Sequence, residues 1–277
     1  MTIALPPIRR FSLTSADPDR LAGFYRDAFG CLPDGGTRRP AASYGVAGGM
    51  SVSNLRLGEE LIELVRFDEP GRPYPPDSTS HDQWFQHLAI VVADMGAAMA
   101  ALGRCADWTP ISLGGPVTLP AEAGGVTAFK FRDPEGHPLE LLQFPSGQAP
   151  PRGRRASAAA RPCLGIDHSA MACSDIARAE AFLAGLGFRP SGRSLNQGPQ
   201  QERLDAAPGV VADVVPVAVP DAPGPHLELL GYRTPAIRPG HTGPNDVAAT
   251  RIVLHGPSND AGLTEDPDGH RFVASPD

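Results

Sequence analysis

The sequence predicts an α+β fold built from tandem modules, each made of a strand, a helix and then about three strands. Two observations predict it. An alternating apolar run, a small polar corner ending in Asp, and a helix-like stretch follow one another repeatedly along the chain. Later aliphatic strands each carry one acidic residue, and Gly-rich turn signals separate the strands. With 31 glycines and 31 prolines, the chain is suited to many short elements and not to a bundle of long helices.

The opening pattern occurs three times in full. It spans residues 10–17, 87–94 and 168–175, and each copy ends in an aspartate. Aspartate at such a corner accepts backbone N–H bonds at the start of a helix. We therefore expect helices over the ranges 18–29, 95–102 and 176–186, capped by Asp17, Asp94 and Asp175 in turn.

Each complete module closes with a strand that holds one glutamate among aliphatic residues. These are Glu63, Glu140 and Glu228. A carboxylate buried alone in an apolar strand is costly, so each needs a partner or a metal. The fourth copy is truncated: an opening strand over 249–255 and a closing turn and strand over 266–275 leave no room for a helix.

The length and composition suggest two domains or one internally repeated domain. The chain has 277 residues, and residues 146–162 have the Pro- and Arg-rich composition of a linker. We predict one domain over 1–145, with modules one and two, and another over 163–277, with module three and the reduced module four. Pairing inside one chain makes either a monomer or a homodimer reasonable.

The net charge of −7 gives no basic field that would attract a nucleic acid or an anionic membrane. There is no run of 18 apolar residues and no signal-peptide pattern, so we expect a cytoplasmic protein whose partner is a small-molecule substrate. The four cysteines form no CxxC pair, which favours structural thiols.

The segments 87–94, 133–141 and 168–175, together with 227–229, resemble the vicinal oxygen chelate superfamily. That superfamily includes glyoxalase I, extradiol dioxygenases, epimerases and bleomycin-resistance proteins. The resemblance covers nearly all of the chain outside residues 146–162. It implies cupped mixed sheets of the glyoxalase/dioxygenase type, formed by paired modules, with a divalent metal ion inside. Its ligands would come from the first and last strands of the modules.

Mapping the ligand positions of that superfamily onto this sequence gives one pair per module. The first three pairs are Arg10 with Glu63, His87 with Glu140, and His168 with Glu228, and in the fourth module the alignment falls near Ala249 and Val273. Imidazole and carboxylate suit a borderline divalent ion, and ligand type alone does not choose among Zn, Ni, Co, Mn and Fe(II).

Which modules face each other decides the metal site. Pairing two with three assembles His87, Glu140, His168 and Glu228, and we favour it because it alone gives a full set. Pairing one with two would leave Glu63, His87 and Glu140, with Arg10 placed to bind a carboxylate and displace the metal. Pairing three with four, which tandem fusion suggests by analogy with extradiol dioxygenases, would leave His168 and Glu228 alone.

The resemblance to glyoxalase I implies a metal-dependent lyase or isomerase acting on a small oxygenated substrate, with Glu140 or Glu228 as general base. The amide-rich stretch 193–201 offers Arg193, Asn196 and Gln200 as substrate-binding candidates, although a surface loop is an alternative interpretation. Two further hypotheses remain open: a metal-free binding protein, as in bleomycin resistance, and an extradiol-type dioxygenase. His226 has no recurring partner and receives no role.

Overall fold

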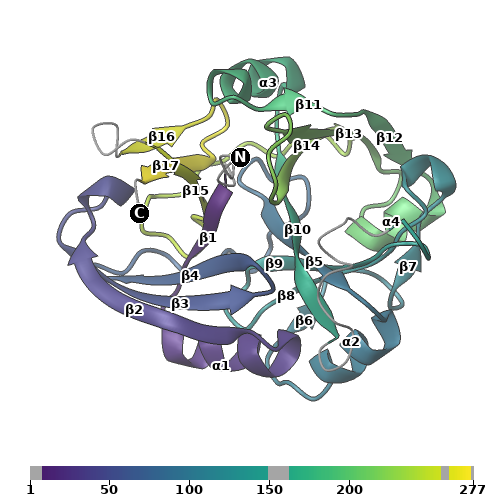
Figure 1. The fold of residues 1–277 in the computed structure, drawn as a ribbon. Coiled ribbons are helices and arrows are strands. Elements are labelled where there is room, and N and C mark those ends of the chain that lie inside the picture. Colours follow the sequence, from purple (N-terminus) through teal and green to yellow (C-terminus); the bar gives the residue numbers. More distant parts are fainter. Residues whose placement is uncertain (1–7, 149–161, 257–261, 276–277) are drawn as a thin grey trace.

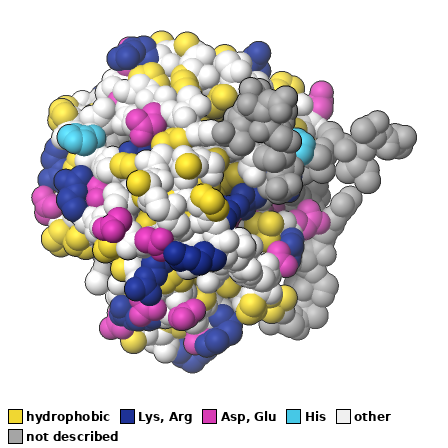
Figure 2. Space-filling model, turned by 90° about the vertical axis from the view of Figure 1, so that its left-hand side faces the viewer, with side chains coloured by type: hydrophobic (Ala, Val, Ile, Leu, Met, Phe, Trp, Pro, Cys, Tyr) yellow, Lys and Arg dark blue, Asp and Glu magenta, His cyan; other side chains and the backbone are white. Residues whose placement is uncertain are grey.

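The computed structural model describes residues 8–148, 162–256 and 262–275, and in them the chain forms two curled mixed sheets with helices outside them (Figure 1). This confirms the predicted α+β fold. The sheets lie side by side, with α1 and α2 below them and α3 above in the view of Figure 1. No helix in the described ranges is long and apolar enough to cross a membrane. On the face drawn in Figure 2, acidic and basic side chains are interspersed.

Modules one and four form a seven-stranded sheet. Its strand order is β16-β17-β15-β1-β4-β3-β2. Module one contributes β1 (Ile8–Thr14), α1 (Pro18–Phe29), β2 (Leu32–Pro40), the short 3-10 helix η1 (Ala42–Tyr44), β3 (Gly49–Leu57) and β4 (Glu60–Phe67). Module four contributes β15 (Arg251–His255), β16 (Leu263–Glu265) and β17 (Arg271–Ser275), and it is truncated as the sequence predicted.

Modules two and three form the other sheet, which has ten strands with the path β11-β13-β14-β10-β5-β9-β8-β6. Module two contributes β5 (Gln86–Val92), α2 (Met95–Leu102), β6 (Thr109–Pro110), β7 (Val117–Thr118), the 3-10 helix η2 (Ala121–Ala123), β8 (Thr127–Arg132) and β9 (Pro138–Gln143). Module three contributes β10 (Cys163–Ala172), α3 (Ile176–Gly185), β11 (Arg189–Pro190), β12 (Ser194–Gln197), α4 (Pro199–Asp205), β13 (Val211–Ala218) and β14 (His226–Thr234).

The modules pair through their opening strands. β10 runs antiparallel to β5, and β1 runs antiparallel to β15. This confirms the favoured pairing of module two with module three. The alternative, in which modules one and two form one sheet and modules three and four the other, is wrong. Each sheet therefore takes strands from both 1–145 and 163–277. Of the predicted linker, residues 149–161 lie outside the described part of the chain.

The predicted helix starts are confirmed. The side chains of Asp17, Asp94 and Asp175 accept hydrogen bonds from backbone N–H groups in the first turns of α1, α2 and α3. Such a cap satisfies one of the donors that a helix start leaves unpaired. Helix α1 then buries the apolar side chains Leu21, Phe24, Tyr25 and Phe29 in the main core. The corners thus fix where each helix leaves its opening strand.

Two equivalent turns tie the sheets together. Nε2 of His137, in the closing turn of module two, donates to the carbonyl of Thr14 in β1 over 2.9 Å. Nε2 of His270, in the closing turn of module four, donates to the carbonyl of Ala172 in β10 over 2.7 Å. Each histidine therefore forms a hydrogen bond between the two sheets. These bonds fix the ends of the opening strands of modules one and three relative to the other sheet.

Candidate metal centre

The strand register places the predicted ligands on one face of the ten-stranded sheet. His168 in β10 pairs with Ala89 in β5, which in turn pairs with Glu140 in β9. The residue two positions after His168 pairs with both His87 and Glu228. Residues opposite each other in neighbouring strands, and residues two apart in one strand, point to the same side. The four side chains therefore converge inside the curve of the sheet.

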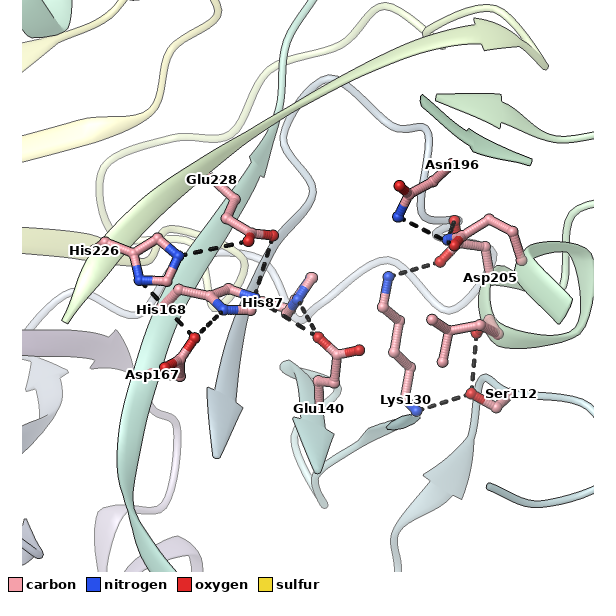
Figure 3. A network of polar contacts seen from close by, with 12 residues as sticks. His87, Ser112, Lys130, Glu140, Asp167, His168, Asn196, Asp205, His226 and Glu228 are labelled. Atoms are coloured by element: carbon pink, nitrogen blue, oxygen red, sulfur yellow. Dashed lines mark hydrogen bonds and ion pairs between the residues drawn. The ribbon is translucent and has the colours of Figure 1, made fainter. Parts of the chain in front are cut away.

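Their polar atoms come close together (Figure 3). Nε2 of His87 lies 3.0 Å from Oε2 of Glu140, and Nε2 of His168 lies 3.7 Å from the same oxygen. Nε2 of His168 also lies 3.5 Å from Oε2 of Glu228. His87, Glu140 and His168 are buried and can each offer one ligand atom, all within 4.8 Å of one another. Glu228 stands at the edge of this group, with its side chain 20% exposed.

This donor set fits a divalent ion. Ligand bonds of about 2.1 Å would hold neighbouring ligand atoms about 3.0 to 3.4 Å apart, and the three distances above lie in or just above that range. Nδ1 of His168 contacts Oδ2 of Asp167 at 3.0 Å, which leaves Nε2 facing the group. Metal-binding histidines are commonly oriented by a carboxylate in this way. His87, Glu140 and His168 are the residues that could hold the ion, and Glu228 lies next to them at the cavity.

Electrostatics make the two histidines different. Burial lowers the pKa of His87, and the positive charge of Lys130 lowers it further, so His87 is neutral at pH 7. Burial would also lower the pKa of His168, but the carboxylates of Glu228 and Asp167 prevail and raise it to about 9. The protonated His168 in turn holds the pKa of Glu228 at about 2, although burial acts to raise it. Without a metal ion the centre therefore carries one imidazolium among its carboxylates.

Asp167 and His226 extend the centre and were missed in the sequence. The register of β10 against β5 shifts between Ile166 and His168, so Asp167 sits in a bulge. A bulge re-aims a side chain out of the simple alternation, which explains why Asp167 reaches His168. His226 pairs with His168 in the sheet, and its Nε2 lies 3.5 Å from Oε1 of Glu228. Only the parallel register of β14 against β10 could have indicated it.

A second polar network lies beside these residues (Figure 3). Lys130 in β8 pairs with Glu140 in the sheet, and its Nζ lies 2.6 Å from Oδ1 of Asp205 at the end of α4. The other oxygen of Asp205 accepts hydrogen bonds from Nε2 of Gln201 at 2.8 Å and from the hydroxyl of Tyr232 at 3.1 Å. Burial would lower the pKa of Lys130, but Asp205 and Glu140 prevail and raise it. Lys130 therefore stays charged.

The three predicted substrate-binding residues fall in different places. Asn196 pairs with Ala212, which pairs with Tyr232, so its side chain points into the curve of the sheet and lines the cavity there. Arg193 is exposed and forms an ion pair with Glu180 at 2.5 Å. Gln200 is exposed on the outside of α4. The structure does not bring Arg193 or Gln200 to the cavity.

The reason is the helix that follows the amide-rich stretch. Residues 199–205 form α4, where consecutive side chains point about 100° apart, so Gln201 faces inward when Gln200 faces outward. Part of this stretch lines the cavity, but the alternation of a strand does not apply beyond residue 197. Gln201 is the cavity residue that the sequence missed by one position.

The cavity has a volume of about 330 Å³ and opens from the inner face of the ten-stranded sheet. The candidate metal ligands and the network of Lys130 and Asp205 both line the cavity. The wall between them is apolar and includes the side chains of Leu119, Leu142, Leu204 and Leu230. A concave, mostly apolar site with a few converging polar groups is typical of small-molecule binding. Its size suits a small substrate.

The equivalent face of the seven-stranded sheet carries arginines in place of histidines. Ser12 pairs with both Glu63 and Arg251, and Arg10 pairs with Val253. By comparison with the other sheet, Arg251 takes the place of His87, two residues beyond the Ala249 position expected from the sequence. The expected Val273 pairs with Val253 and occupies the place of Glu140.

An ion-pair cluster fills that position. Oε1 of Glu63 contacts Arg10 at 2.7 Å and Arg39 at 2.8 Å, and Oε2 of Glu63 accepts a hydrogen bond of 2.5 Å from the Tyr44 hydroxyl. Glu63 is only 2% exposed, so these partners are what makes its burial tolerable. At these positions this sheet offers guanidinium groups, which cannot ligate a metal ion. Arg10 thus neutralises Glu63, and it does so in the sheet of modules one and four and not in the pairing of one with two for which the sequence suggested that role.

Solved structures share this architecture. Glyoxalase I from Zea mays aligns over 96% of this chain and 91% of its own, with 15% identity and a TM-score of 0.60. A proposed dioxygenase from Bacillus subtilis aligns over 100% of this chain and 87% of its own, with 13% identity and a TM-score of 0.59.

The chain has the glyoxalase/dioxygenase fold. The resemblance to the vicinal oxygen chelate superfamily is thereby confirmed for the fold. No family model matches the sequence, and no curated protein sequence matches it.

Proposed function

We propose that this protein with the glyoxalase/dioxygenase fold is a metal-dependent enzyme of the glyoxalase I-like lyase or isomerase type, acting on a small substrate with adjacent oxygen atoms. The observation that carries the proposal is the convergence of the two imidazoles and two carboxylates, with contacts of 3.0, 3.5 and 3.7 Å, at the wall of a cavity. A divalent ion held there would polarise adjacent substrate oxygens as a Lewis acid and so acidify a neighbouring C–H bond.

The residues of the chain divide the remaining work. His87, Glu140 and His168 form the tighter group and are assigned to holding the ion. Glu228 stands apart at the cavity, between His168 and His226, and is assigned as the base that takes the proton from carbon. A catalytic base needs a pKa near the working pH.

The state of His168 controls that pKa. The value of about 2 for Glu228 is caused mainly by the positive charge of protonated His168, against the effect of burial. When His168 loses its proton to become a ligand, this cause is removed, but the charge of the ion, partly neutralised by Glu140, would then act on Glu228 against the effect of burial. Loss of the imidazolium charge is therefore one of the changes that Glu228 needs to act as a base near neutral pH.

The first test is metal content and proton exchange. Purified protein loaded with Zn²⁺, Ni²⁺, Co²⁺, Mn²⁺ or Fe²⁺ should retain about one ion per chain. His87→Ala and His168→Ala should lose it, whereas His241→Ala, which removes an exposed histidine, should keep it. The loaded protein should exchange the carbon-bound protons of hydroxyacetone in D₂O, followed by NMR, and Glu228→Gln should abolish exchange while keeping the ion.

The outcomes separate the hypotheses. Retention of no ion by wild-type protein would reject the enzyme mechanism and leave a metal-free small-molecule binding protein. Retention of the ion, with exchange no faster than that of the free ion in buffer, would reject the lyase or isomerase proposal.

A second candidate function is an extradiol-type dioxygenase. The group His87, Glu140 and His168 is a set of two histidines and one carboxylate, and such a set with open positions is typical of non-heme Fe(II) oxygenases. Oxygen uptake by the Fe²⁺-loaded protein with catechol would favour this function over the first. Absence of uptake, with proton exchange present, would reject it.

A further inference from the structure

Lys130 is a buried cation in the wall of the cavity that the proposed chemistry does not use. The residue is 4% exposed, yet it lines the cavity together with His87, Glu140 and His168. Its backbone pairs with that of Glu140, so the two side chains leave the sheet on the same side. Figure 3 shows Lys130 extending alongside Glu140 with its amine directed to Asp205. It is well placed to contact any substrate bound beside the metal ligands.

The ammonium group is held in place but is not saturated. Nζ donates to Oδ1 of Asp205 at 2.6 Å, and Asp205 is itself fixed by Gln201 and Tyr232 through its other oxygen. An ammonium group has three N–H donors. Within residues 8–148, 162–256 and 262–275 this is its one hydrogen bond, so two donors remain beside the cavity. Buried donors of this kind are normally satisfied by an acceptor, which here a ligand oxygen can provide.

The charge of Lys130 is already offset. Among the described residues that line the cavity, Lys130 is the single lysine or arginine, whereas five lining residues are acidic: Glu122, Glu140, Asp167, Asp205 and Glu228. Asp205 compensates the ammonium at 2.6 Å, and a divalent ion would be compensated by Glu140 together with the neighbouring carboxylate of Glu228. A substrate carboxylate would therefore enter a low-dielectric cavity with no unpaired positive charge to meet it, which is costly. A carbonyl or hydroxyl oxygen carries no such cost.

We propose that Lys130 is a specificity-determining residue that donates a hydrogen bond to an uncharged oxygen of the substrate and selects against a carboxylate at that position. The inference deepens the proposed function and rests on it. The substrate class is then a small molecule with two adjacent oxygens at one end, an apolar body against the leucines of the wall, and a neutral carbonyl or hydroxyl oxygen at the Lys130 end.

The test compares three chelating probes on protein loaded with Zn²⁺, by isothermal titration calorimetry. Methylcatechol has only the two adjacent oxygens, protocatechualdehyde adds a neutral carbonyl, and protocatechuate adds a carboxylate. Wild-type protein should bind the aldehyde about three- to tenfold more tightly than methylcatechol, since one hydrogen bond has about that effect. Protocatechuate should bind no more tightly than methylcatechol.

Two variants isolate the role of Lys130. Lys130→Met keeps the length of the side chain and removes its donors, so the ratio between aldehyde and methylcatechol affinities should fall about three- to tenfold relative to wild type. Because the ratio is compared between proteins, the different intrinsic chelating strengths of the probes cancel. Asp205→Asn keeps Lys130 and removes its compensating charge, so protocatechuate should now bind at least about tenfold more tightly than it binds wild type.

Each failure has a distinct meaning. If zinc is retained and methylcatechol binds, but the aldehyde ratio is unchanged in Lys130→Met and protocatechuate gains nothing in Asp205→Asn, the inference about Lys130 is overturned and the proposed function stands. If protocatechuate is the tightest ligand of wild-type protein, the inference is equally overturned. If methylcatechol does not bind the zinc-loaded protein at all, the proposed function fails, and the inference fails with it.

Discussion

Metal binding by this protein should tighten steeply as the pH rises from 7 to 9. His168 has a pKa of about 9 in the metal-free chain, because the carboxylates of Glu228, Asp167 and Glu140 outweigh the effect of burial. A histidine must lose a proton before it can ligate a metal ion. Protons and metal ions therefore compete for this site throughout the physiological range.

The magnitude follows from one competing proton. Well below the pKa of His168, each pH unit should weaken metal binding tenfold. Because His168 is already half protonated at pH 9, the change from pH 9 to pH 7 amounts to about fiftyfold, or about 2.3 kcal/mol. The pKa values of His87, Glu140 and Glu228 are all lowered, so these groups already bind no proton between pH 7 and 9 and add nothing to the slope. The expected slope is one proton per ion.

The affinity for Co²⁺ is measured at pH 7, 8 and 9 by competition with a chromophoric chelator. The number of protons released on binding is measured at pH 7.5 by calorimetry in buffers of different ionisation enthalpy. Asp167→Asn serves as the matched control, because the loss of its charge should lower the pKa of His168 and reduce proton release. An affinity that does not change between pH 7 and 9, or binding without proton release in the wild type, would refute the reasoning.

Three further outcomes are expected. In metal-free protein kept in chelator, the pKa of His168 in the folded chain lies above its unfolded value of about 6.5. Protonated His168 therefore stabilises the fold fully below pH 6.5, and this stabilisation falls by about 3 kcal/mol as the pH rises through 9. Urea unfolding at pH 6, 7.5 and 9 measures the change, and an unchanged free energy of unfolding would contradict it. Glu63→Gln should lower the free energy of unfolding by about 3 to 5 kcal/mol, because it removes the buried charge that pairs with Arg10 and Arg39. Metal content should not change, and loss of the metal would show that metal binding in one sheet depends on the ion pairs of the other. Asp94→Ala should cost about 1 kcal/mol through the lost 2.7 Å cap on Ala97 N–H in α2, measured by thermal unfolding, and an unchanged transition temperature would show that the cap contributes nothing.

Local chemistry made much of the fold predictable. The capping aspartates, the apolar face of α1 and the recurrence of one strand pattern are properties of short stretches, and helices α1 and α2 begin and end where the sequence predicts. Helix α4 was not predicted, because a seven-residue helix after a glycine carries a weak signal. This is why the inward residue there is Gln201 and not Gln200.

The candidate site was predictable only where it repeats. His87 and His168 occupy the same place in their modules, as do Glu140 and Glu228, and the recurrence marked them. Their supporting residues do not recur. Asp167 depends on a bulge in β10, and the contact between Lys130 and Asp205 joins residues that are 75 positions apart in the chain. No pattern within a segment encodes such contacts.

The sequence by itself determined the modules: where strands and helices begin, which positions carry imidazole or carboxylate, and that the fourth copy is short. Only the tertiary structure decided which modules share a sheet, and with it which of these positions converge. Pairing β10 with β5 brings two histidines to one cavity, whereas pairing β1 with β15 brings Arg10 and Arg251 to the other sheet. The physical reason is that secondary structure follows from interactions between near neighbours, while sheet pairing depends on the burial of whole faces formed by distant segments.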